Sequence, residues 1–98
     1  MEEVKVTFED DTELAEFEAI SKGYRNDVYV TIDKYTFNIA AYSMVRLQQD
    51  FESEINNYGF YSIEANLVLV KETSRKEIVE VINNLYEEGY FNKIKSLY

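Results

Sequence analysis

The sequence predicts one α+β domain over residues 1–98, a small antiparallel sheet of four or five strands packed by two main helices. The chain is 46% hydrophobic and 15% aromatic, far more apolar than a disordered chain. Several segments alternate between apolar and polar residues, whereas two others have helical spacing. There is no proline and there are only three glycines, so no linker divides the chain.

Three segments have the period-two pattern of a strand with one buried face. The first is residues 3–9, where valine and phenylalanine alternate with polar residues. The other two are residues 28–32 and 35–41, which meet at Asp33-Lys34. A two-residue connection predicts that they form a β-hairpin.

Two segments are predicted as helices from their caps and apolar stripes. Ser43 is a good N-cap for a helix over 44–58, which ends at Gly59. The stripe of this helix is Met44, Leu47, Phe51, Ile55 and Tyr58. Ser74 begins a capping box for a second helix over 75–88, which ends at Gly89.

The apolar run within residues 65–71 is typical of a strand in the centre of a sheet. Beyond the second helix, Phe91, Ile94 and Leu97 predict a last short turn that packs back on the domain. Seven side chains are expected to be buried: Leu47, Phe51, Ile55, Leu69, Ile78, Val81 and Leu85.

Residues 12–22 are compatible with either a helix or a strand. Their composition is that of a helix, but Glu13 falls among Leu14, Phe17 and Ile20 on a helical wheel. A strand would place Ala15, Phe17 and Ala19 on one face and Glu16 and Glu18 on the other, and we favour it. A strand gives a meander followed by α, β and α, whereas a helix gives the ferredoxin-like order βαββαβ plus a C-terminal helix.

The chain contains no histidine and no cysteine. These absences remove the commonest general base, the thiolate nucleophile and the usual transition-metal ligands. The three glycines lie at the ends of separate elements, so they form no phosphate-binding loop. We therefore expect no enzymatic activity, no catalytic residues, no metal site and no cofactor.

Nineteen acidic and ten basic residues give a net charge of −9. This charge disfavours direct binding to nucleic acid and favours a basic protein partner. The chain begins with acidic residues and has no apolar run of membrane-spanning length, so we expect a cytoplasmic protein that does not enter membranes.

The acidic charge is concentrated in residues 1–20, which hold eight acids and one base. This segment has two interpretations: a charged face that only keeps the domain soluble, or a surface that steers a basic partner. We favour the partner surface, because acids spread evenly would make the chain equally soluble. Tyr24 follows in a predicted polar loop over residues 23–27, and tyrosine is frequent at binding surfaces. The predicted protein-binding residues are Asp10, Asp11, Glu13, Glu16, Glu18 and Tyr24.

The sequences VRLQQDF at 45–51, NLVLV at 66–70 and LYEEGYF at 85–91 lie in a strand, helix, strand, helix pattern over about residues 28–94. In this pattern the chain resembles small immunity proteins encoded beside bacterial polymorphic toxins. The resemblance implies a cytoplasmic inhibitor of one toxin, often a nuclease with a basic active site, and it carries over no functional residue.

Two other functions are compatible with the sequence. One is a phage-type nucleic-acid mimic, whose carboxylates imitate phosphates and occupy the groove of a restriction or CRISPR enzyme. The other is a structural domain that forms oligomers through an exposed strand edge. Competition by nucleic acid would distinguish the mimic from the immunity protein, and sedimentation would reveal the oligomer.

Overall fold

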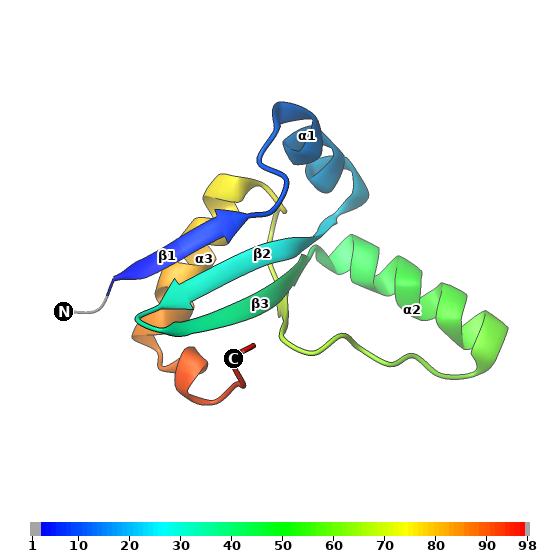
Figure 1. Cartoon of the computed structure of the whole chain (residues 1–98). Helices are drawn as coiled ribbons and strands as arrows, with labels where there is room; N and C mark the ends of the chain where they lie inside the picture. The colour runs from blue at the N-terminus through cyan, green and yellow to red at the C-terminus, as the bar shows by residue number, and fades with distance from the viewer. Residues whose placement is uncertain (1–2, 98) are drawn as a thin grey trace.

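The computed structural model describes residues 3–97 and confirms the α+β class. In Figure 1, α3 lies behind the sheet, α1 lies at one end of it and α2 projects away from it. The elements in chain order are β1 (Val4–Phe8), α1 (Glu13–Lys22), β2 (Tyr24–Ile32), β3 (Tyr35–Tyr42), α2 (Met44–Tyr58), β4 (Leu67–Leu69), α3 (Arg75–Glu87) and the short 3-10 helix η1 (Tyr90–Asn92).

Within residues 3–97 the sheet has four strands in the order β1-β2-β3-β4. The first three pair antiparallel, with Val30 opposite both Val6 and Phe37. The predicted hairpin is confirmed, and its turn is made by Asp33, whose φ of 56° is in the left-handed region. Since β4 pairs parallel to β3, the sheet is mixed, and the prediction of a wholly antiparallel sheet is wrong at this strand.

One face of the sheet forms the core together with α3 and η1. Val28, Val30 and Ile39 point into it from β2 and β3, and all three are almost fully buried. Phe91 from η1 packs on Phe37 with 5.1 Å between the ring centroids. The predicted turn after the second helix therefore packs back on the domain through Phe91 and the partly buried Ile94. Leu97 differs from the prediction: its side chain is 52% exposed, although its backbone N–H donates to the carbonyl of Thr36 at 2.7 Å.

Glu13–Lys22 form a helix with Thr12 as its N-cap, so the strand that we favoured over residues 12–22 is wrong. The Thr12 hydroxyl accepts from the N–H of Ala15 at 3.1 Å, and Gly23 ends the helix in the left-handed conformation. The element order is therefore that of the ferredoxin-like alternative, but its pairing is different. A split βαβ unit separates its two strands by a third, whereas β1 pairs directly with β2.

The burial predicted for the second helix is confirmed in α3. Ile78 is 1% exposed, and Val81 and Leu85 are partly buried against the core. The helix begins as predicted, because the Ser74 hydroxyl accepts from the N–H of Glu77 at 3.3 Å. α3 is therefore the helix that covers the sheet.

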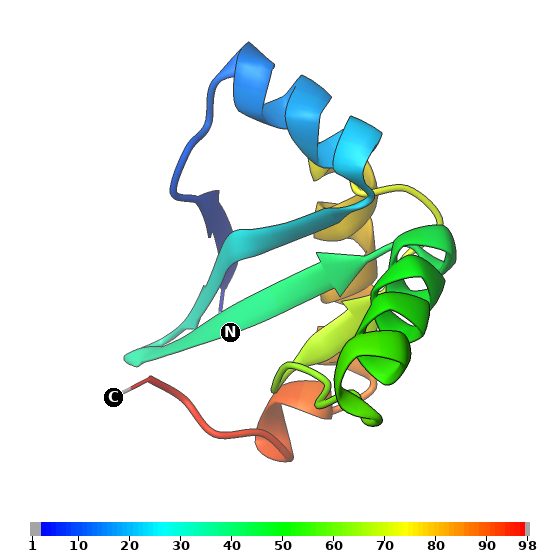
Figure 2. The same cartoon turned by 90° about the vertical axis from the view of Figure 1, so that its right-hand side faces the viewer.

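The burial predicted for α2 and β4 is largely wrong. Leu47 is half-buried, but Phe51, Ile55 and Leu69 are exposed. α2 extends beyond the sheet and the following segment returns beside it, so none of its 15 residues, all of them described, is buried (Figures 1 and 2). Leu69 lies in a three-residue strand at the edge of the sheet and not at its centre.

The end of α1 touches the beginning of α2. The backbone N–H of Ser43, the N-cap of α2, donates to the carbonyl of Gly23 at 2.8 Å. A Cβ at position 23 would lie 2.6 Å from the Ser43 hydroxyl oxygen and 3.0 Å from Cβ of Arg46. Both this contact and the positive φ require glycine here, so α1 ends and α2 begins at one backbone crossing.

The burial pattern predicts different costs for truncating Ile78 and Leu69. We expect Ile78→Ala to lower the free energy of unfolding by about 2 to 5 kcal/mol, because it leaves a cavity under α3. Leu69→Ala should lower the free energy of unfolding by at most about 1 kcal/mol, because Leu69 is already half-exposed. Urea unfolding measures both, and equal losses would contradict the placement of the core.

Candidate functional site

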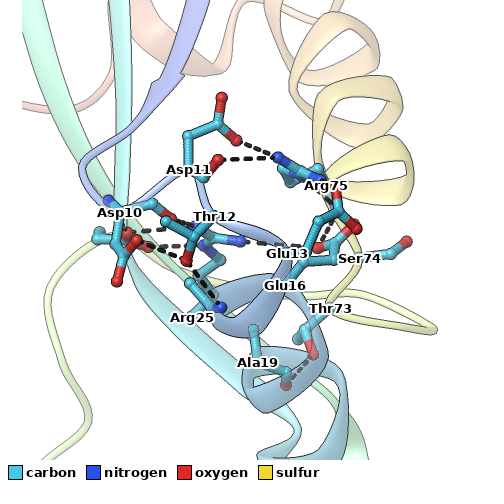
Figure 3. A network of polar contacts seen from close by, with 12 residues as sticks. Asp10, Asp11, Thr12, Glu13, Glu16, Ala19, Arg25, Thr73, Ser74 and Arg75 are labelled. Atoms are coloured by element: carbon cyan, nitrogen blue, oxygen red, sulfur yellow. Dashed lines mark hydrogen bonds and ion pairs between the residues drawn. The ribbon is translucent and has the colours of Figure 1, made fainter.

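Four of the five predicted acidic residues, Asp10, Asp11, Glu13 and Glu16, gather around Arg25 and Arg75, as Figure 3 shows. Arg25, in β2, is 4% exposed. Its Nε donates to Oδ1 of Asp27 at 2.7 Å, and its Nη2 donates to the carbonyl oxygen of Asp10. The guanidinium also lies 4.4 Å from the centre of the Phe8 ring. Arg25 thus links β2 to the segment that precedes α1.

Glu16 completes the surroundings of Arg25 from α1. Its Oε1 lies 3.6 Å from Nη1 of Arg25, an ion-pair distance beyond a hydrogen bond. Within residues 3–97 this Nη1 has no hydrogen-bond partner. The Glu16 carboxylate also accepts from the backbone N–H of Arg75, at the first turn of α3, at 3.0 Å. A negative group is stabilised there by the helix dipole, so Glu16 joins α1 to both β2 and α3.

The second arginine, Arg75, binds the outer acids. Its Nη1 donates to the Asp11 carboxylate, its Nη2 donates to Glu13 at 3.2 Å, and its Nε lies 3.4 Å from Glu16. The hydrogen bond with Asp11 is the main cause that raises the pKa of Arg75 above its ordinary value. Asp11 and Glu13 are exposed to solvent, so these two contacts orient the side chains more than they stabilise the fold.

The two remaining predicted residues lie outside this network. Glu18 is exposed on α1, 3.9 Å from Lys22. Tyr24 stacks on Tyr42 with ring centroids 5.5 Å apart, and the guanidinium of Arg46 lies 4.5 Å from its ring. The structure therefore brings Asp10, Asp11, Glu13 and Glu16 together but places Tyr24 at the junction with α2, where it is half-buried. The predicted loop over residues 23–27 is wrong, because Tyr24 begins β2 and pairs with Tyr42 of β3.

α1 faces its small and acidic side inward. Ala19 is buried, and its carbonyl accepts from the hydroxyl of the buried Thr73 at 2.7 Å. The large apolar side chains face outward: Leu14 is 67% exposed and Phe17 is 68% exposed. An amphipathic helix normally buries its large apolar residues, so this outward face is the unusual feature of the helix.

The outward face of α1 combines apolar side chains with exposed acids. Leu14 and Phe17 lie between Glu13 and Glu18 in the sequence, and both glutamates are exposed. Apolar anchors beside a charged rim are typical of protein-binding surfaces. We call Leu14, Phe17, Glu13 and Glu18 the α1 surface. The sequence analysis did not select Leu14 and Phe17. The position of Glu13 among apolar residues on the helical wheel was a signal that this face of the helix is exposed to solvent.

A hollow of about 270 Å³ lies between α1 and β2, and Glu9, Glu18, Lys22 and Asn26 are among its lining residues. No group of three or more acidic side chains within 3–97 is arranged to hold a metal ion. None of the helices in that range has the length and apolarity needed to cross a membrane.

Comparison with known proteins gives no relative: no family model matches the chain, and neither a curated protein nor a solved structure is significantly similar to it.

The hydrogen bonds to Asp27 predict how acid affects stability. Burial raises the pKa of this carboxyl, but hydrogen bonds from Arg25 and from the N–H of Asp10 outweigh burial and hold the pKa below its usual 3.8. A lowered pKa in the folded state stabilises the fold above about pH 4, and this contribution is lost as the pH falls below that value.

Asp27→Asn removes the titrating group. We expect the variant to be less stable than the parent at neutral pH but to lose less stability on acidification, because asparagine binds no proton. Urea unfolding at several pH values from neutral to about pH 3 measures this. Parallel stability curves for the two proteins would show that Asp27 does not contribute.

Proposed function

We propose that this protein binds another protein, and that the α1 surface is where it does so. The observation that carries this proposal is the outward orientation of Leu14 and Phe17 beside exposed acids. Two large apolar side chains exposed on one helix are costly in water unless a partner covers them. The network of Arg25 and Arg75 holds the helix in this orientation.

The proposed partner is basic. The chain has a net charge of −9, and residues 1–20 carry most of it. Such a field speeds the approach of a positively charged surface, while burial of aromatic side chains supplies the affinity. The function that fits best is an immunity-type inhibitor in the cytoplasm, which neutralises a basic toxin such as a nuclease.

The nucleic-acid mimic is the weaker alternative. A mimic needs unpaired carboxylates to imitate a row of phosphates, whereas Asp11, Glu13 and Glu16 are paired with Arg75. The exposed apolar side chains of α1 also have no counterpart in a phosphate backbone. An apolar surface with an acidic rim favours a partner that is bound through protein contacts.

The test compares capture of partners from a lysate of the native host. The baits are the parent and a Leu14→Ser, Phe17→Ser variant, which should fold because both side chains are exposed. A Tyr35→Ser variant, changed at an exposed aromatic residue of β3, is the matched control. A basic protein retained by the parent and the control but lost from the α1 variant would support the proposal. Equal capture by all three would overturn it.

The two kinds of residue in the α1 surface should affect different rate constants. Changing Glu13 and Glu18 to glutamine should slow association at low salt, by up to roughly ten-fold, with little effect on dissociation. Phe17→Ala should act mainly on dissociation and weaken binding by about 2 kcal/mol. Tyr24→Ala should have a smaller effect, because Tyr24 is half-buried against Tyr42.

Surface-binding kinetics with the captured partner at two ionic strengths measure these effects. The parent should associate more slowly at high salt, and the glutamine variant should show a weaker salt dependence. An unchanged association rate in the variant at low salt would show that the acids serve only solubility.

A further inference from the structure

The apolar stripe of α2 is exposed along the whole helix. Met44, Phe51, Ile55 and Tyr58 are between 37% and 69% exposed, and Leu47 is half-buried. Figures 1 and 2 show the helix projecting from the sheet with only the segment after it running alongside. In a single chain the apolar face of this amphipathic helix is therefore left in contact with water, which is typical of an interaction surface.

The segment that follows α2 widens this apolar surface. Tyr61 packs edge-on against Phe51 with 6.5 Å between the ring centroids. Phe60 and Ile63 in the same segment are 65% and 59% exposed. Between the helix and the segment lies a groove of about 200 Å³, lined by Met44, Leu47, Gln48, Phe51, Tyr61 and Ile63. We call the stripe together with Phe60 and Ile63 the α2 face.

The spacing of the stripe is symmetric about Phe51. Its members are separated by three, four, four and three residues along the chain. A second copy of the helix, antiparallel to the first and related to it by a two-fold axis at Phe51, would place Met44 opposite Tyr58 and Leu47 opposite Ile55. Every apolar side chain then meets an apolar side chain, which is the self-complementarity that an isologous interface requires.

The size of the surface also fits a second copy. If each large side chain offers about 200 Å², the exposed fractions on the α2 face amount to about 700 Å² in each copy. A stable interface buries about 800 Å² on each partner. We propose that the protein forms a homodimer through the α2 face, with the two α2 helices antiparallel and Phe51 at the two-fold axis.

The charges on α2 make the proposed dimer sensitive to salt in a characteristic direction. Asp50 is paired with Arg46 at 2.9 Å, but Glu52 and Glu54 have no ion pair among the residues described. Dimerisation brings these acids closer together and joins two chains that each carry a net charge of −9. Added salt screens this repulsion, so dimerisation should strengthen with salt, whereas binding of a basic protein weakens.

Sedimentation equilibrium of the full chain at low and high salt tests the proposal. We expect a dimer whose dissociation constant falls as salt is raised, and a monomer for Phe51→Glu. Phe17→Glu, which places the same charge on the α1 surface, is the matched control and should still dimerise. Circular dichroism and urea unfolding establish that both variants are folded. A parent that is monomeric at both salt concentrations, or a Phe51→Glu variant that still dimerises, would overturn the proposal.

Disulfide formation tests the antiparallel arrangement, because the natural chain has no cysteine. Phe51→Cys should form a disulfide-linked dimer on mild oxidation, since the two copies of this position meet at the axis. Met44 lies seven residues away, so its two copies would be about 20 Å apart along antiparallel helices, beyond the reach of a disulfide. Met44→Cys should therefore stay unlinked, and efficient linkage of both variants would indicate parallel helices and overturn the arrangement.

Discussion

The buried guanidinium of Arg25 is the constraint on which the N-terminal half of the fold depends. A cation that is removed from water needs carboxylates or carbonyls around it, and loss of one partner from such a pair is strongly destabilising. Here the partners come from Asp27, from the carbonyl of Asp10 and from Glu16 in α1. Because Glu16 must face inward, Leu14 and Phe17, which lie about 200° and 100° around the helix from it, face solvent.

The core and the exposed apolar surfaces belong to different elements of the fold. The core consists of one face of the sheet together with Ile78 and Ile82 of α3 and Phe91 of η1. α1 contributes only Ala19 to the buried set, and α2 contributes nothing to it. Stability therefore rests on the strands and α3, so the outward residues of α1 and α2 can change without altering the packing that holds the domain together.

The sequence predicts those parts of the fold that local signals specify. The hairpin around Asp33 and the two capped helices that begin after Ser43 and Ser74 are where the pattern indicated. The helix at 13–22 was missed because its inward face is selected by ion pairs with Arg25 and Arg75. Those arginines are distant in the sequence, and a helical wheel contains no information about them.

Periodicity also reveals that a helix has an apolar side without revealing what covers that side. This is why Phe51 and Ile55 were wrongly expected in the core, although the helix itself was predicted correctly. The charge distribution was enough to name the candidate acids. It did not show that Glu16 is structural while Glu13 and Glu18 are exposed. That division depends on which way α1 is turned, and so on contacts with β2 and α3.

The backbone crossing at Gly23 and Ser43 determines what a pair of these chains would present. The crossing joins the end of α1 to the beginning of α2 through a backbone hydrogen bond, so the direction of one helix is tied to that of the other. In a two-fold dimer formed through α2, the two α1 surfaces lie at a fixed distance from each other, so the dimer is bivalent. A target whose two binding sites match that separation engages the second site intramolecularly, so two weak contacts give tight binding. A target with one site gains nothing from the pairing.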